Sequence, residues 1–235
     1  MIQLYRTLNS FWEEGFLNRF FIVFIIVGIL PFLFFEKGQE ILLLNRYSHP
    51  SIDDFIVNFT HMGNGLVWLF IAVIFVFIRF SAALTALFVL IFNGLFIFVF
   101  KKLLFNGMPR PTAFLPTESF YHFIEGFTYH TSNSFPSGHT MTAFSVAFFL
   151  SYYLRDVRVS VLLMIYAVLI GFSRMYLLLH FYVDIYVGVI MGLMCFLAAR
   201  YVTEEVLLLH KRKAWSHALR LIVAKPREAI VEAGA

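Results

Sequence analysis

The chain has 235 residues, of which 60% are hydrophobic and only 14% charged, and its mean hydropathy is +0.81. Soluble domains have about 45–50% apolar and about 25% charged residues, so this composition excludes an ordinary soluble protein and predicts a membrane protein. The net charge of +4 is modest and gives no reason to expect a nucleic-acid partner. The single cysteine, Cys195, excludes an intrachain disulfide and is expected to be a packing residue in its apolar run.

The first twenty residues do not resemble a cleavable signal peptide. They carry Arg6, Glu13, Glu14 and Arg19, and no small-residue cleavage site follows the apolar run. We therefore expect the mature chain to begin at Met1.

Six stretches are long and apolar enough to predict membrane-spanning helices, which need about 20 mostly apolar residues each. They lie at 17–35, 63–79, 82–100, 139–154, 157–173 and 180–199. Short turns join the second span to the third and the fourth to the fifth. The prediction is an all-α membrane protein with six transmembrane helices. Residues 1–235 are expected to form a single domain, because no internal repeat or low-complexity segment divides them.

Three longer segments lie outside these spans. Residues 36–62 are mixed in character and are expected to form short interfacial helices. Residues 101–138 are rich in Pro, His, Ser and Thr and predict a structured loop. Residues 200–235 combine basic and apolar residues, which is typical of an amphipathic tail lying on the membrane surface.

The distribution of basic residues predicts the orientation. With six spans both termini lie on one side, and 12 of the 18 Lys and Arg residues fall there. The other six are Lys37, Arg46, Lys101, Lys102, Arg110 and Arg174. The positive-inside rule therefore places both termini in the cytoplasm and the 101–138 loop outside. For a bacterial-type protein this means the inner membrane, with the polar loop facing the periplasm or exterior.

Three polar stretches map to that outer side: KKLLFNGMPRP at 101–111, NSFPSGHT at 133–140 and SRMYLLLHFYVD at 173–184. In the third, His180 and Asp184 are four residues apart, so on a helix they share one face. The carboxylate can then accept the imidazole Nδ1–H and leave Nε2 as a free lone pair, which prepares a base or nucleophile. Ionisable groups in membrane segments are costly and suggest a functional site.

The same stretches supply groups suited to an anion. Arg110, Arg174 and a lysine add fixed positive charge matched to phosphate. The N–H groups of Ser137, Gly138 and His139 lie at a predicted helix start, where anions bind readily. His139 is placed to act as an acid. A metal site is not expected, because the carboxylates typical of magnesium sites are missing and Asp184 is committed to His180.

Together these residues resemble the signature of the type 2 phosphatidic acid phosphatase (PAP2) superfamily, integral-membrane lipid phosphatases related to vanadium haloperoxidases. That pattern is K-x6-R-P, then P-S-G-H, then S-R-x5-H-x3-D. The chain has RP at 110–111, PSGH at 136–139 and the complete third motif at 173–184, so that the match covers 102–184. The spacing departs at the lysine, because Leu103 stands where the pattern has lysine. Lys102 is the expected phosphate-binding lysine, with Gly107 absorbing one extra residue, and Lys101 stays open as an alternative.

The resemblance implies a metal-independent reaction without cofactors. His180 would attack phosphorus to form a phosphohistidine, Asp184 would orient it, and His139 would protonate the leaving oxygen and then activate water. The phosphate would be held by Lys102, Arg110, Ser137, Gly138 and Arg174. The substrate would be a lipid phosphate: phosphatidylglycerol phosphate, undecaprenyl pyrophosphate, phosphatidic acid or a lipid A phosphate.

Alternatives remain at this level. The same phosphohistidine could pass its phosphoryl group to a lipid or sugar acceptor, or the protein could bind or translocate lipid phosphates without catalysis. A channel is disfavoured because the polar groups gather at one face. A second set of polar residues is a weaker candidate for the cavity rim: His122, Glu125, His130, Asp53, Asp54, Thr60 and His61. Asn93 is expected to make an interhelical hydrogen bond. The sequence does not define the oligomeric state.

Overall fold

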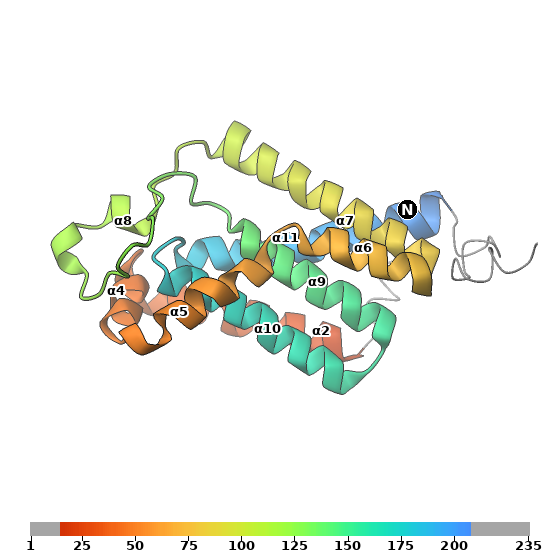
Figure 1. Cartoon of the computed structure of the whole chain (residues 1–235), viewed down its shortest axis with the longest axis horizontal. Helices are drawn as coiled ribbons and strands as arrows, with labels where there is room; N and C mark the ends of the chain where they lie inside the picture. Colours follow the sequence, from red (N-terminus) through yellow and green to blue (C-terminus); the bar gives the residue numbers. More distant parts are fainter. Residues whose placement is uncertain (1–14, 208–235) are drawn as a thin grey trace, which may run out of the picture.

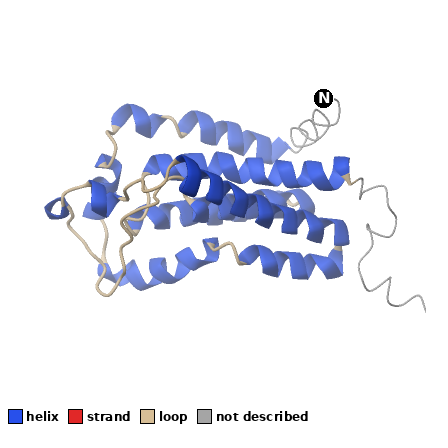
Figure 2. Ribbon diagram, turned by 90° about the horizontal axis from the view of Figure 1, so that it is seen from above, coloured by secondary structure: helices blue, strands red, loops and turns tan. Residues whose placement is uncertain are grey.

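The computed structural model describes residues 15–207, and the regular secondary structure of this part of the chain is all helical, without a strand. Six longer helices run roughly along one axis, and shorter helices and the long loop gather at one end (Figures 1 and 2). The six longer helices are α2 (Gly15–Val27), α6 (Val67–Ile78), α7 (Phe80–Phe98), α9 (Gly138–Leu154), α10 (Val157–Tyr176) and α11 (Tyr182–Tyr201). All three predicted motifs lie at the loop-rich end.

Helix α9 forms the centre of the bundle. Every side chain from residue 140 to residue 149 is buried, and α9 packs along both α10 and α11. Asp156 caps the start of α10 by accepting the N–H groups of Arg158 and Val159. Because only two residues separate α9 from α10, the two helices run antiparallel as the sequence predicts.

Two glycines allow α11 to approach α9 closely. A Cβ at Gly188 would lie 2.9 Å from the Ser137 carbonyl oxygen, and a Cβ at Gly192 would lie 2.7 Å from the Met141 carbonyl oxygen. This spacing of four residues is the small-residue packing pattern of membrane helices. The contact brings the start of α9, with the second motif, against the start of α11, with the third.

Helix α7 carries the first motif at its end. Its first half is buried against α6, α9 and α11, and its second half becomes more exposed. The helix then continues as the π-helix η2 (Val99–Leu104), closed by a hydrogen bond of 2.8 Å from Phe105 N to Phe100 O. Such i→i+5 turns are rare and change which residues share a face.

Short elements build the loop-rich end. They are α4 (Gln39–Arg46), α5 (Pro50–Phe59), the 3₁₀ helix η1 (Thr60–Gly63), α8 (Pro111–Phe114) and the 3₁₀ helix η3 (Thr117–Ser119). The short helices predicted for 36–62 are therefore confirmed, and residues 105–137 form the expected structured loop. Beyond α11, the π-helix η4 (Val202–Val206) ends the described chain, so most of the predicted amphipathic tail lies outside the described residues.

The predicted spans are confirmed in part. Within residues 15–207, three helices are long and apolar enough to cross a membrane: Phe80–Leu104, Val157–Tyr176 and Tyr182–Val206. The count rises to five if two bent pairs each form one span. The first predicted span is broken: α2 (Gly15–Val27) and α3 (Leu30–Phe34) are separate helices. The second is short, because α6 begins at Val67 and bends by 55° from the preceding helix. Helix α9, with 17 residues, is central but shorter than these spans.

Candidate active site

A cavity of about 370 Å³ lies where α7 ends and α9 begins. Its lining brings together groups from all three sequence motifs: Lys101, Arg110, Gly138, His139, Arg174 and His180. Residues of η1 and the start of α6 close another side, with Gly63, Asn64 and Gly65. The motifs are up to 79 positions apart in the sequence (Lys101 to His180), and the packing of α7, α9, α10 and α11 unites them.

The pair expected from the third motif is present. His180 Nδ1 lies 3.2 Å from Asp184 Oδ2, and both side chains are only 2% exposed. Asp184 also accepts the Phe181 N–H (3.0 Å), which fixes its carboxylate at the start of α11. His180 lines the cavity whereas Asp184 lies behind it. A carboxylate bound to Nδ1 favours the tautomer with a lone pair on Nε2.

His180 lies between α10 and α11, in an environment that disfavours its protonation. Burial lowers the pKa of His180 well below its ordinary value of 6.5, and the positive charges of Lys101, Arg174 and Arg110 lower it further. The imidazole is therefore neutral at neutral pH, and its lone pair is available.

The two arginines are held by neighbouring oxygen atoms. Arg110 donates from Nε to the Ser132 carbonyl (2.9 Å) and from a terminal nitrogen to the Leu179 carbonyl (3.2 Å). Arg174 donates to the Thr60 hydroxyl at 2.8 Å. These contacts leave other guanidinium N–H groups beside the cavity, where a planar donor fork suits phosphate. Thr60 was a weak rim candidate, and the structure gives it this supporting contact.

The lysine on the cavity is Lys101 and not Lys102, the lysine that the sequence led us to expect there. Lys101 is partly buried, lines the cavity and donates to the Asn133 carbonyl at 3.0 Å, whereas Lys102 is exposed and outside the lining. The physical reason is the π-helix, whose wider turn changes the face on which each lysine lies. Counting residues back from Arg110 could not detect this change.

Ser137, expected from the sequence to hold phosphate, makes contacts within the fold. Its N–H donates to the Asp184 carbonyl (3.0 Å), and its hydroxyl caps α9 at the Thr140 N–H, so it does not line the cavity. The first intrahelical bond of α9 runs from Met141 N to Ser137 O. The N–H groups of Gly138 and His139 precede it and are the unsatisfied donors typical of a helix start. These two groups, rather than Ser137, are the backbone donors near the cavity.

The remaining rim candidates are divided between three places. His130 lines the cavity, His61 lines a separate apolar groove beside α6, and Asp54 and Glu125 are exposed. Asn93 makes the predicted interhelical hydrogen bond, to the Ser145 hydroxyl at 3.2 Å.

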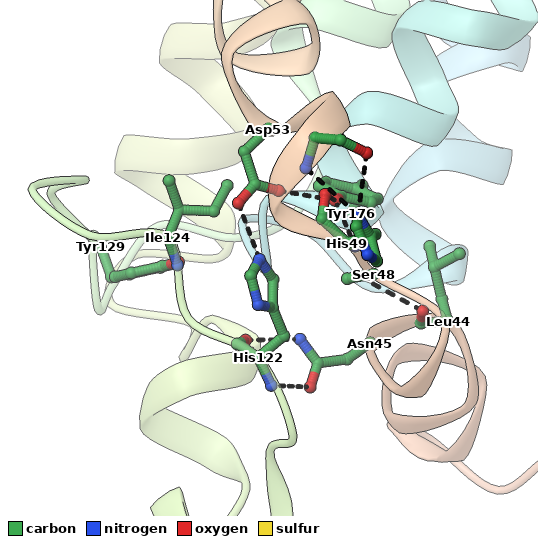
Figure 3. Close-up of polar contacts among 10 residues, drawn as sticks. Leu44, Asn45, Ser48, His49, Asp53, His122, Ile124, Tyr129 and Tyr176 are labelled. Atoms are coloured by element: carbon green, nitrogen blue, oxygen red, sulfur yellow. Dashed lines mark hydrogen bonds and ion pairs between the residues drawn. The ribbon is translucent and has the colours of Figure 1, made fainter.

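His122 and Asp53 form a second polar cluster away from the cavity (Figure 3). His122 Nε2 lies 2.8 Å from Asp53 Oδ2, and the other Asp53 oxygen accepts the Tyr176 hydroxyl at 2.6 Å. Asn45 bonds to the backbone of the same loop, at Tyr121 and His122. This cluster ties the long loop to α4, α5 and α10.

Sequence reasoning missed one residue in direct contact with the site groups. Ser134 is 1% exposed and donates its hydroxyl to Asp184 Oδ2. It lies three residues before Ser137 in the quoted stretch NSFPSGHT, but a serine in a polar loop carries no signal of burial. Only the folded chain shows its partner.

The fold and the cavity define a class: an integral membrane protein of apolar helices with a buried, cationic site containing two histidines. The PAP2 superfamily model matches residues 82–207, more than half of the chain, and this chain belongs to that superfamily.

Two solved structures are similar to it. LpxE of Aquifex aeolicus shares 27% identity with a TM-score of 0.59, over 69% of this chain and 93% of that one. The first transmembrane PAP2 type phosphatidylglycerolphosphate phosphatase from Bacillus subtilis shares the fold, with 23% identity and a TM-score of 0.52, over 79% of this chain and 94% of that one. No curated protein matches the chain.

Proposed function

We propose that this protein is a phosphatase that releases phosphate from a lipid at the membrane. The observation that carries the proposal is the cavity itself, in which a carboxylate-oriented His180, a second histidine and three cations meet. Three fixed positive charges against the single carboxylate Asp184 suit a phosphate dianion. Membership of the PAP2 superfamily and the similarity to two membrane phosphatases support the same activity.

The first step forms a covalent intermediate. His180 Nε2 donates its lone pair to phosphorus, and the bond from phosphorus to the lipid oxygen breaks. His139, which takes up a proton when the phosphate dianion binds beside it, gives this proton to the departing oxygen. Lys101, Arg110 and Arg174, with the Gly138 and His139 N–H groups, stabilise the charge on the phosphoryl oxygens, which is usually the largest contribution in such reactions.

The second step regenerates the enzyme. His139, now neutral, removes a proton from water, the resulting oxygen attacks phosphorus, and the phosphorus–nitrogen bond to His180 breaks. Asp184 stabilises the positive ring that exists while the phosphoryl group is attached. The products are inorganic phosphate and the dephosphorylated lipid.

The proposed topology has six crossings, with both termini in the cytoplasm and the site facing the periplasm or exterior. In this proposal the six crossings are the three long spans, the two bent helix pairs and α9, most of whose 17 residues are buried in the bundle. The excess of Lys and Arg on the side of the termini supports the orientation. Single cysteines placed in the 101–138 loop of a Cys195→Ala chain should react with an impermeant maleimide in intact cells. Labelling only after permeabilisation would reverse the orientation.

The decisive experiment is phosphate release by the purified protein in detergent. The panel contains phosphatidylglycerol phosphate, phosphatidic acid, undecaprenyl pyrophosphate and a lipid A phosphate, with His180→Ala as the control. We expect free phosphate from at least one lipid and acid-labile radiolabel on the wild-type protein during turnover. A labelled acceptor without free phosphate would identify a phosphotransferase, and the absence of both products would overturn the proposed function.

A further inference from the structure

Ser132, Asn133 and Ser134, shortly before the PSGH motif, contact groups of both other motifs. The Ser132 carbonyl accepts Arg110 Nε at 2.9 Å, and the Asn133 carbonyl accepts Lys101 Nζ at 3.0 Å. Two successive carbonyls therefore hold two of the three cations that line the cavity.

Ser134 adds a side-chain contact to this arrangement. Its hydroxyl donates to Asp184 Oδ2, the same oxygen that faces His180 Nδ1. The residue is 1% exposed, and its N–H donates to the Met108 carbonyl at 3.0 Å, so its position is fixed from both sides. Ser134 thus contacts the carboxylate that orients His180.

The backbone of Asn133 makes this arrangement geometrically feasible. Its φ is +58°, in the left-handed region, where asparagine is tolerated and β-branched residues are outliers. A left-handed residue turns the chain, so that consecutive carbonyls need not alternate between opposite sides as they do in a strand. The Asn133 side chain supports the turn by accepting the Gly107 N–H at 3.3 Å.

We propose that Ser132, Asn133 and Ser134 form a positioning segment that sets the distance between the phosphate-binding cations and the nucleophile. The proposal rests on the proposed function for its kinetic consequences. Lysine and arginine side chains have many rotamers and lose conformational entropy when they are ordered. Because these carbonyls hold them in place before the substrate binds, that entropy loss does not weaken binding. A carbonyl that accepts from each cation orients it without neutralising its charge.

The first test uses the left-handed position. Asn133→Gly retains access to positive φ, whereas Asn133→Val does not. We expect Asn133→Gly to stay near wild type and Asn133→Val to lose about 100-fold in kcat/KM, as misplacement of catalytic groups by about an ångström does. Arg155→Val is the matched control, because Arg155 also has positive φ (+54°) but ends α9 away from the cavity. It should lower thermal stability and leave kcat/KM per folded molecule unchanged.

Binding of orthovanadate gives a readout that does not need turnover. Calorimetric titration in detergent should show weaker vanadate binding for Asn133→Val than for Asn133→Gly and wild type. If the wild type binds vanadate but releases phosphate from no lipid, the proposed function fails while the positioning role is still tested by this series. Equal vanadate affinity and equal kcat/KM in the two Asn133 variants would overturn the positioning role.

The second test removes the Ser134 hydroxyl. Its donation draws negative charge from Asp184, so Ser134→Ala should strengthen the attraction of Asp184 for protonated His180. The acid limb of the kcat/KM profile should then move to higher pH, with kcat lowered about tenfold by loss of a hydrogen bond to a charged group. Ser160→Ala, a buried serine that bonds to the Asp156 carbonyl, is the control and should leave the limb in place. An unmoved limb in Ser134→Ala would refute this part of the proposal.

Discussion

The protein contains two histidine–aspartate pairs whose geometry is nearly the same and whose surroundings differ. His180 and Asp184 are one helical turn apart in sequence, 3.2 Å apart in space and almost fully buried. His122 and Asp53 are 69 positions apart and 2.8 Å apart, with side chains 18% and 10% exposed. Distance alone would rank the second pair above the first.

The difference lies in what each pair faces. His180 opens onto a cavity with three cations, and only its Nδ1 side is occupied by Asp184. His122 does not line that cavity, and both oxygens of Asp53 are used, one by His122 and one by Tyr176 (Figure 3). A histidine–carboxylate pair therefore indicates catalysis only where the second ring nitrogen has room for a reacting atom. Elsewhere the same pair joins segments of the fold.

Replacing each histidine should give the largest contrast. His180→Ala is expected to lower kcat by about 10⁴-fold or more, since a nucleophile has no substitute. His122→Ala should leave kcat unchanged and lower the melting temperature by about 2–4 °C, because the loop loses one buried contact. Phosphate release and thermal unfolding of both variants measure the two effects. Similar activity in the two variants would contradict the assignment of a catalytic role to His180 and a structural role to His122.

Replacing each carboxylate by its amide is the next contrast. Asp184→Asn removes the charge that orients and stabilises the His180 ring, and a fall in kcat of about 100-fold or more is expected. Asp53→Asn keeps an oxygen for Tyr176 and should preserve kcat. The measurement is kcat of the two purified variants, Asp184→Asn and Asp53→Asn. A large loss in Asp53→Asn without unfolding would assign the second pair a role in the reaction.

The two adjacent lysines, Lys101 and Lys102, test which side chain belongs to the site. Lys101→Ala should lower kcat/KM by about 10- to 100-fold, the effect of one charge-assisted hydrogen bond, whereas Lys102→Ala should have no effect. Kinetics on a single lipid phosphate suffice. The reverse order would restore Lys102 as the phosphate ligand.

The pH dependence should show the smallest and most specific effect. Because the pKa of His180 is depressed, the ring stays neutral and the acid limb of kcat/KM lies below pH 6.5. Positive charges contribute to this depression, so Lys101→Met should raise the pKa of His180 and move the limb upward. His122→Ala should leave the limb where it is in the wild type. A downward shift in Lys101→Met would exclude the electrostatic explanation.

Sequence alone was sufficient to pair His180 with Asp184 and to place the start of α9. The spacing of His180 and Asp184 predicts a shared helical face; the contact is present, but His180 lies just before α11 and not on it. The PSGH stretch predicts a helix start, which is confirmed. Apolar runs located α7, α10 and α11 within a few residues. These features depend on local periodicity, which a sequence displays directly.

Features that depend on contacts between distant segments were not predictable in this way. The partner of Asp53 is set by the course of a long loop, and the burial of Ser134 by the approach of α11 to α9. The Gly188 and Gly192 pair that permits this approach was visible as a GVIMG pattern and could have predicted a close helix contact. It could not have named α9 as the partner.

The π-helix at the end of α7 has a consequence for how such proteins vary. A rigid α-helix of altered length would rotate its last lysine away from the cavity with each added residue. A wider turn followed by Gly107, which has a φ of +76°, lets the Lys101 amine reach the Asn133 carbonyl with eight residues between Lys101 and Arg110. We therefore expect the site to tolerate the insertion or deletion of a single residue at this junction. Patterns that fix the number of residues between lysine and arginine would then overlook relatives with an equivalent cavity.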